Sequence, residues 1–506
     1  MLNKKVILFL WAIAGTCSAV AQNNSSFQEF RKGIFNDYNN FRNSILENYD
    51  KFLENAWSDY GSFRGESRSP VPKPSAVPRA TDFPQRPPVT EIPAPVPAPV
   101  PAPAPTPVPV PDAPKPKPEQ PVPPVPPAEQ PPAPPAERPA AGPQFRFPFY
   151  GMEMQIPAID FKIARQMSGT RDYAAQWRNL EKNGVARQVL PHVAELAERY
   201  SLNDYLKYEL LSAYVHNRFS QVHVTSRMSL LHYLLAHLGY DARIAVNGSG
   251  YPMILIPFRQ EVYARPYLVL DGRKYYVFAD VKLDMSRPEN MRIFTCDLPA
   301  NAQAGEIMDL KLSGLNLPYE PYHYDIAYEN LHIQGEVNKN IFPVLYRYPQ
   351  MPTEDFACSE VCPDIRASIV EQLKPQLAGM SQTESVDALL KFVQGFDYAT
   401  DEDFHGFEKP YFFEEMLFYP KCDCEDRAIF YTYLLWNVLG VENHLICYPG
   451  HESAAVHLAE DIGGDAYEYK GTKFYISDPT YIGASTGMCM PMFVNVSPQI
   501  DYIYKK

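Results

Sequence analysis

The sequence predicts an α+β fold in which a central buried helix packs on an antiparallel sheet. Residues 425–439 are apolar nearly all round, which is typical of a helix in the middle of a domain. Two strand-like runs follow, at 457–462 and 473–478. An upstream stretch, 202–280, repeats a similar succession of helices and a final strand ending in aspartate. We therefore expect two copies of one unit, with two further segments before them.

The chain begins with the pattern of a signal peptide, residues 1–21. Lys4 and Lys5 precede a short apolar stretch, 6–14, and residues 19–21 have the A-x-A form of a cleavage site. A lipid-attachment cysteine at Cys17 fits less well, because residues 14–16 lack the usual leucine. We expect an exported protein, located in the periplasm, in the cell envelope or outside the cell.

Residues 22–66 form the first mature segment and contain an 11-residue repeat. Aromatic residues recur at Phe27, Tyr38, Tyr49 and Tyr60, and eleven residues make three helical turns. The pattern predicts an amphipathic helix with an aromatic stripe over 27–60. This stripe should bind a partner protein, a second copy of itself or an envelope surface. The alternative is a helix that folds back on its own globular domain.

Residues 67–143 are rich in proline, alanine, valine and glutamate. Such a composition cannot form a packed core, so we expect a disordered, extended spacer that reaches at most about 3.1 Å per residue. Its expected role is to hold the globular part away from the N-terminal helix.

Globular composition begins near residue 144. We expect a degenerate copy over 144–286, a β-rich connector over 287–350 and a catalytic domain over 351–506. The alternative is two unrelated α+β domains. The net charge is −13 and no basic stripe is present, which argues against a nucleic-acid partner.

Seven of the eight cysteines follow the expected cleavage site. An odd number leaves at least one thiol free, which fits one reactive cysteine and up to three disulfide bonds. Cys424 is the expected free thiol and Cys422 is its rival. Since no calcium-loop or zinc spacing occurs, we expect neither a metal nor a cofactor.

Three residues in order suggest a catalytic triad: Cys424, His457 and Asp478. Cys424 opens the apolar helix, where the helix dipole favours a thiolate. His457 stands at a predicted strand start, and Asp478 ends the next strand before Pro479. In such a triad the histidine deprotonates the thiol and the aspartate orients the histidine. His451 is the rival base, expected in a turn after Pro449-Gly450.

This region resembles the transglutaminase-like superfamily of papain-related cysteine enzymes. The resemblance rests on residues 423–428, on His457 and on residues 478–480, and it covers roughly 352–504. It implies that Cys424 is the nucleophile, His457 the general base and acid, and Asp478 the orienting residue. The family often has glycine two residues before the cysteine, whereas this chain has Cys422 there. The upstream copy has His223 or Val224 at the place of the nucleophile.

The expected function is that of an exported cysteine peptidase, amidase or acyltransferase. It would cleave or transfer the amide acyl groups of a protein or peptide substrate through a thioester. The alternative is a non-catalytic, tethered binding or scaffold protein of the cell envelope.

Overall fold

The computed structural model describes residues 77–82, 92–97, 144–159, 163, 167, 170–246, 252–270, 272–279, 292–294 and 305–505. The chain divides into two compact units, Met1–Ser58 and Asp59–Lys506, and all described residues belong to the second. The predicted signal peptide and the predicted helix at 22–66 lie outside the described residues. The described part contains both helices and antiparallel sheets, so the α+β class is correct.

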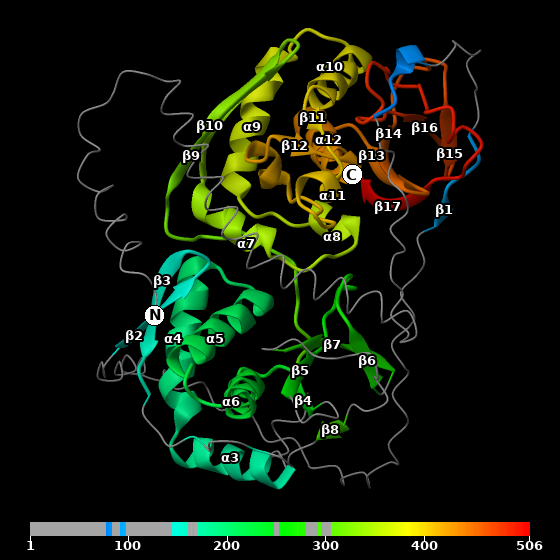
Figure 1. The fold of residues 1–506 in the computed structure, drawn as a ribbon. Helices are drawn as coiled ribbons and strands as arrows, with labels where there is room; N and C mark the ends of the chain where they lie inside the picture. The colour runs from blue at the N-terminus through cyan, green and yellow to red at the C-terminus, as the bar shows by residue number, and fades with distance from the viewer. Residues whose placement is uncertain are drawn as a thin grey trace, which may run out of the picture. The chain divides into compact units, whose positions relative to one another are not determined.

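The upstream lobe begins with a hairpin and four helices (Figure 1). These elements are β2 (Gln144–Phe149), β3 (Met152–Pro157), α3 (Thr170–Lys182), α4 (Val185–Tyr200), α5 (Asp204–Arg218) and α6 (Val224–His237). A five-stranded sheet follows, made of β4 (Arg243–Val246), β5 (Pro252–Ile256), β6 (Tyr267–Leu270), β7 (Arg273–Phe278) and β8 (Arg292–Phe294). Helix α6 packs on β4 and β5.

A connector links this lobe to the C-terminal domain. It contains the hairpin of β9 (Pro321–Tyr328) and β10 (Leu331–Asn338), then a 3₁₀ turn, η5 (Lys339–Ile341), and the short helix α7 (Phe342–Tyr346). The hairpin packs on α9 of the C-terminal domain, as the ribbon also shows (Figure 1).

The C-terminal domain has helices before its sheet. They are α8 (Thr353–Ala357), α9 (Pro363–Gln376), α10 (Gln382–Gln394), α11 (Asp401–Phe404), η6 (Phe413–Leu417) and α12 (Cys424–Leu439), with β11 (Asp397–Tyr398) and β12 (Lys421–Cys422) among them. The sheet strands are β13 (Asn443–Tyr448), β14 (His451–Val456), β15 (Ala466–Tyr469), β16 (Thr472–Ile476) and β17 (Gln499–Tyr504).

Helix α12 is the centre of this domain. It packs on α9 and α10 and on strands β13 and β14. It ends at Gly440, whose φ of 65° is the left-handed conformation that glycine adopts most readily. Ser381, directly before helix α10, caps it: its side chain accepts a hydrogen bond from Glu384 N at 3.3 Å. The central buried helix of the prediction is therefore present.

The two sheets have the same strand order. The upstream order is β6-β7-β5-β4-β8 and the C-terminal order is β15-β16-β14-β13-β17. If the five strands of each sheet are numbered as they follow in the chain, both orders are 3-4-2-1-5. All these pairs are antiparallel. Each sheet also follows a buried helix that packs on its first two strands. A duplicated unit would show this order, and the duplication itself stays a prediction.

Two pieces of the Pro-rich segment lie against the C-terminal domain. Residues 80–82 form a 3₁₀ turn, η2 (Ala80–Asp82), and β1 (Val96–Pro97) pairs in parallel with β17. Ile92 donates from its backbone N to Ala466 O at 2.6 Å. These two pieces therefore do not behave as the free spacer that composition predicted, because Ile92 supplies an apolar anchor among the prolines.

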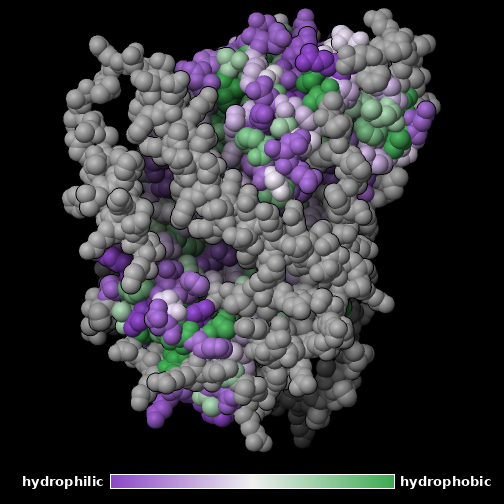
Figure 2. Space-filling model, viewed as in Figure 1, coloured by the Kyte–Doolittle hydropathy of each residue, from purple (hydrophilic) through white to green (hydrophobic). Residues whose placement is uncertain are grey.

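The visible face of the molecule mixes hydrophilic and hydrophobic side chains (Figure 2). Among the described residues, no helix has the length and apolar character needed to cross a membrane.

Candidate active site

Cys424 is the first residue of α12 and is buried, with 1% of its surface exposed. The preceding residue, Asp423, donates from its backbone N to Asp426 Oδ2 at 2.9 Å. The other oxygen of Asp426 accepts from Tyr411 N at 2.8 Å. These bonds satisfy backbone donors around the helix start and fix the position from which the Cys424 side chain extends.

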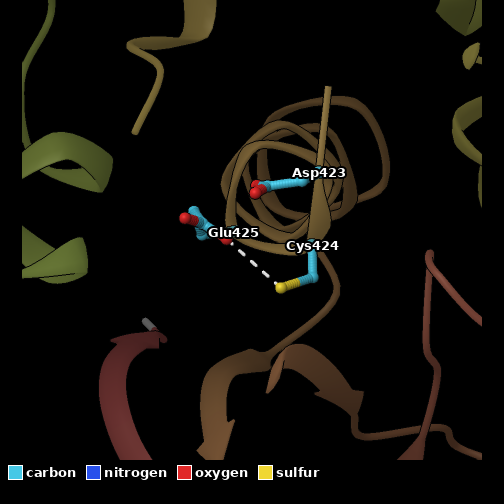
Figure 3. A group of neighbouring side chains, drawn as sticks. All are labelled: Asp423, Cys424 and Glu425. Carbon is cyan, nitrogen blue, oxygen red and sulfur yellow. Dashed lines mark hydrogen bonds between the residues drawn. The ribbon is translucent and has the colours of Figure 1, made fainter. Parts of the chain in front are cut away.

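The thiol of Cys424 contacts the carboxylate of its neighbour. Sγ lies 3.2 Å from Glu425 Oε2, and both residues are buried (Figure 3). A nearby carboxylate disfavours the thiolate, whereas the N-terminal end of a helix favours it. Because these two effects oppose each other, the ionisation of the Cys424 thiol also depends on its other neighbours.

Asp478 binds His451, and the prediction that it orients His457 is wrong. Nε2 of His451 lies 2.8 Å from Asp478 Oδ2. His457 lies beyond the end of β14, and its Nδ1 is 3.0 Å from Lys473 O. Pro449-Gly450 is a two-residue hairpin loop between β13 and β14, so His451 is already a strand residue and not part of an exposed turn.

The His451–Asp478 pair defines the tautomer of the histidine. A carboxylate only accepts hydrogen bonds, so Nε2 of His451 carries the proton. In the neutral ring the lone pair is then on Nδ1. That atom is buried and has no hydrogen-bond partner among the described residues. A buried imidazole nitrogen in this state can accept a proton from a group that reaches it.

Asp478 is itself held in place. Its Oδ1 accepts from Thr480 N at 2.9 Å and from Tyr481 N at 3.3 Å. Gln394 of α10 donates from Nε2 to Tyr481 O at 3.0 Å and to Ala484 O at 3.1 Å, which fixes the following loop. The carboxylate is thus oriented before any substrate arrives.

Arg427 connects the first turn of α12 with this loop. Its Nη1 donates to Pro479 O at 3.4 Å, and its Nη2 donates to Phe396 O. Arg427 lies one turn after Cys424, and Pro479 directly follows Asp478. Further along, Tyr431 OH and Ser477 Oγ are 2.7 Å apart. The beginning of α12 therefore lies at the end of the sheet that carries Asp478 and its partner His451.

Cys422 is a poor nucleophile in this setting. It is buried, and burial raises the pKa of its thiol to about 12 despite the nearby Arg427, whose Nε is 3.5 Å from Sγ. The six described cysteines form no disulfide bonds: Cys358, Cys362, Cys422, Cys424, Cys447 and Cys489. Any bridge within the chain would have to involve the cysteines outside the described residues.

Several carboxylates lie near the start of α12 and are close enough together to hold a cation. One group is Asp401, Asp423 and Asp426, and another is Asp423, Cys424 and Glu425 (Figure 3). Asp401 Oδ2, however, accepts from Lys409 N at 2.6 Å, and both oxygens of Asp426 accept backbone N–H groups. Asp401 and Asp426 therefore already have a structural role as acceptors of backbone N–H groups, which explains much of this cluster of carboxylates.

Sequence reasoning missed three residues around the site: Glu425, Gln394 and Phe493. The Phe493 ring lies parallel to the His451 ring, with centroids 5.3 Å apart and 2° between their planes. Glu425 was visible as the residue after the cysteine, but its burial was not. Gln394 and Phe493 are far from the motif in sequence, and no local pattern connects them with it.

A comparison with models of known protein families finds none that matches this chain. A comparison with curated proteins finds no match either.

Proposed function

We propose that this chain is an exported, transglutaminase-like cysteine enzyme that cleaves or transfers amide acyl groups. Cys424 is the nucleophile, His451 takes the place that sequence analysis gave to His457, and Asp478 orients His451. The observation that carries the proposal is the buried His451–Asp478 pair, with Nδ1 of His451 unprotonated and unpartnered among the described residues.

The chemistry follows from this tautomer. Nδ1 of His451 accepts the proton of the Cys424 thiol, and the thiolate attacks the amide carbonyl carbon of a protein or peptide substrate. The imidazolium, stabilised by Asp478, then gives its proton to the leaving amine as the C–N bond breaks. A thioester remains on Cys424. Water or a second amine attacks the carbonyl carbon of the thioester, and His451 removes the proton of that nucleophile. The C–S bond then breaks, and the leaving Cys424 thiolate takes this proton back from His451.

The proposal requires Sγ of Cys424 and Nδ1 of His451 to meet. The hydrogen bond from Arg427 to Pro479 O supports this requirement, since it brings the first turn of α12 to the residue after Asp478. Catalytic contacts often tighten only when substrate is bound.

The test measures both reactions of the thioester, hydrolysis by water and transfer to an amine. The mature full-length protein is incubated with a complex peptide mixture, and new N-termini are identified by mass spectrometry. A parallel reaction contains dimethylated casein and a fluorescent primary amine. Activity in either assay should disappear in Cys424→Ala and His451→Ala and persist in the matched control, His457→Ala. Activity that survives Cys424→Ala would refute the proposal.

A second candidate function is that of a non-catalytic envelope scaffold. It is favoured by the burial of Cys424 and by the contact of its thiol with the Glu425 carboxylate, which disfavours the thiolate. Under this reading Cys424 reacts with iodoacetamide in the folded protein no faster than an ordinary thiol with a pKa of about 8.5.

A further inference from the structure

The candidate site is closed to solvent. The exposed fractions of Cys424, His451 and Asp478 are 1%, 3% and 1%. A peptide bond of a protein substrate cannot reach a thiol and an imidazole that water itself does not reach. Some part of the structure must therefore move before these groups can meet a substrate.

Phe493 covers His451. Its ring is parallel both to His451 and to Tyr448, with the Tyr448 ring centroid 4.7 Å away and 12° between the planes. Phe493 belongs to the segment 490–497, whose backbone hydrogen bonds close turns within it. Phe493 N donates to Met490 O and Val496 N donates to Phe493 O, each at 2.9 Å. A segment held mainly by local bonds and side-chain packing opens at low cost in free energy.

The first Pro-rich piece, 77–82, packs on this cover. Ala80 donates from its backbone N to Ile482 O at 2.9 Å. Its side chain packs against the small apolar cluster of Tyr481, Ala484 and Met490, against which Phe493 also packs. Ala80 and Phe493 therefore pack against the same cluster, and Ala80 is also hydrogen-bonded to the loop that follows Asp478.

The second Pro-rich piece, 92–97, is the anchor. Ile92 is only 4% exposed and lies in an apolar cluster that includes Ile446, Ala455 and Ile476. Strand β1 then pairs with β17 at the edge of the same sheet. Burying an isoleucine side chain is a substantial favourable contribution for so short a segment. A charge at position 92 cannot remain in that cluster.

We propose that these two pieces, 77–82 and 92–97, form a latch that holds Phe493 over His451, and that release of the latch opens the candidate site. The consequence for catalysis rests on the proposed function. The control of access to His451 by the latch does not rest on it, because His451 becomes accessible or stays buried whether or not Cys424 reacts. The occupant of this surface is the chain's own Pro-rich segment, which can be released by a competing peptide or by cleavage.

The test uses the full-length chain and three variants. Ile92→Asp should release the latch, and Ala94→Asp adds the same charge at an exposed position as the matched control. Phe493→Ala removes the cover but leaves the latch docked. Hydrogen exchange of peptides covering 77–97 reports docking. Acylation of His451 by diethylpyrocarbonate, followed by mass spectrometry, reports access independently of the thiol.

In the unmodified chain and in Ala94→Asp, the amides of Ala80 and Ile92 should be protected and His451 should react slowly. In Ile92→Asp the protection should be lost and His451 should react about tenfold faster or more. In Phe493→Ala, His451 should react as fast as in Ile92→Asp, while the Ile92 amide stays protected from exchange. Exchange within α12 serves as the check that the domain remains folded.

Two results would overturn the latch. One is fast exchange of the Ala80 and Ile92 amides in the unmodified chain. The other is an Ile92→Asp variant with a freed segment and an unchanged rate at His451. Failure of the proposed function looks different, because Cys424 would then react with iodoacetamide no faster than an ordinary thiol with a pKa of about 8.5 even in Phe493→Ala, where His451 reacts quickly.

Discussion

Replacing each of two histidines in turn tests which one serves Cys424. His451 is hydrogen-bonded to Asp478 at 2.8 Å, whereas His457 is bonded through Nδ1 to a backbone carbonyl at 3.0 Å. If His451 stabilises the thiolate, His451→Ala should slow alkylation of Cys424 at slightly acidic pH. His457→Ala should leave the rate within about twofold.

The magnitude follows from the ionisation of the thiol. A cysteine with the ordinary pKa of about 8.5 is about 1% thiolate at pH 6.5, whereas a thiolate paired with imidazolium is almost fully ionised there. The gain in thiolate is about 100-fold. A thiol that is almost fully ionised at pH 6.5 has a pKa lower by about three units, and its thiolate is then less nucleophilic by about 20-fold. We therefore expect His451→Ala to slow alkylation about fivefold at pH 6.5, with the difference disappearing above pH 9.

The assay is iodoacetamide labelling of the folded full-length chain from pH 5.5 to 9.5, with the modified peptide containing Cys424 quantified by mass spectrometry. Because Cys424 is buried, the same series is run in the Phe493→Ala background, where access does not limit the rate. Equal rates for His451→Ala and its parent at pH 6.5 would refute the reasoning. So would a slower rate in His457→Ala.

Three further predictions concern stability, each measured by urea unfolding. Asp478→Ala removes hydrogen bonds from His451 and from two backbone N–H groups and should lower the free energy of unfolding by about 2–4 kcal/mol. Buried Arg366 donates to the two carboxylate oxygens of Glu414 at 2.7 and 3.0 Å. Glu414→Gln leaves the charge of Arg366 without its counter-charge and should lower the free energy of unfolding by about 3–5 kcal/mol. Burial and nearby Asp309 raise the pKa of Asp355 to about 6, so the folded state holds this proton more tightly than the unfolded state. Asp355→Asn should therefore stabilise by about 1 kcal/mol above pH 6 and not at all near pH 3; equal gains at both pH values would contradict this sign.

The sequence predicted the elements of the fold whose burial and ends are determined by residues close together in the chain. Helix α12 was recognisable because a helix that is apolar on all sides must be buried, and because Gly440 ends it in a left-handed conformation. The positions of Cys424 and Asp478 followed from that helix and from the strand before Pro479. The histidine did not follow, since His451 and His457 both stand near strand ends. The antiparallel pairing of β14 with β16 decides between them, because it places the start of β14, with His451, near the residues that follow β16, and His457 near Lys473.

Contacts between distant segments could not be predicted in this way. The docking of Ile92 depends on an apolar surface that the sheet presents on the side away from α12, and no periodicity in a proline-rich stretch announces it. The same holds for Phe493 and Gln394, which reach the site from loops and helices far from the motif. The shared strand order of the two sheets likewise becomes visible only when the pairing of strands is known.

The parallel pairing of β1 with β17 has a consequence for solubility. Without β1, β17 would be the outermost strand, and its sequence from Gln499 to Tyr504 is rich in tyrosine and isoleucine. An uncovered strand of this kind is a template for pairing with another chain. Pro97 lacks a backbone N–H, so the two-residue strand that covers it offers little to a further strand. Because β1 pairs only with Gln499 and Ile500, loss of the 92–97 piece would expose the free edge of β17 at these two residues as a place for another chain to pair.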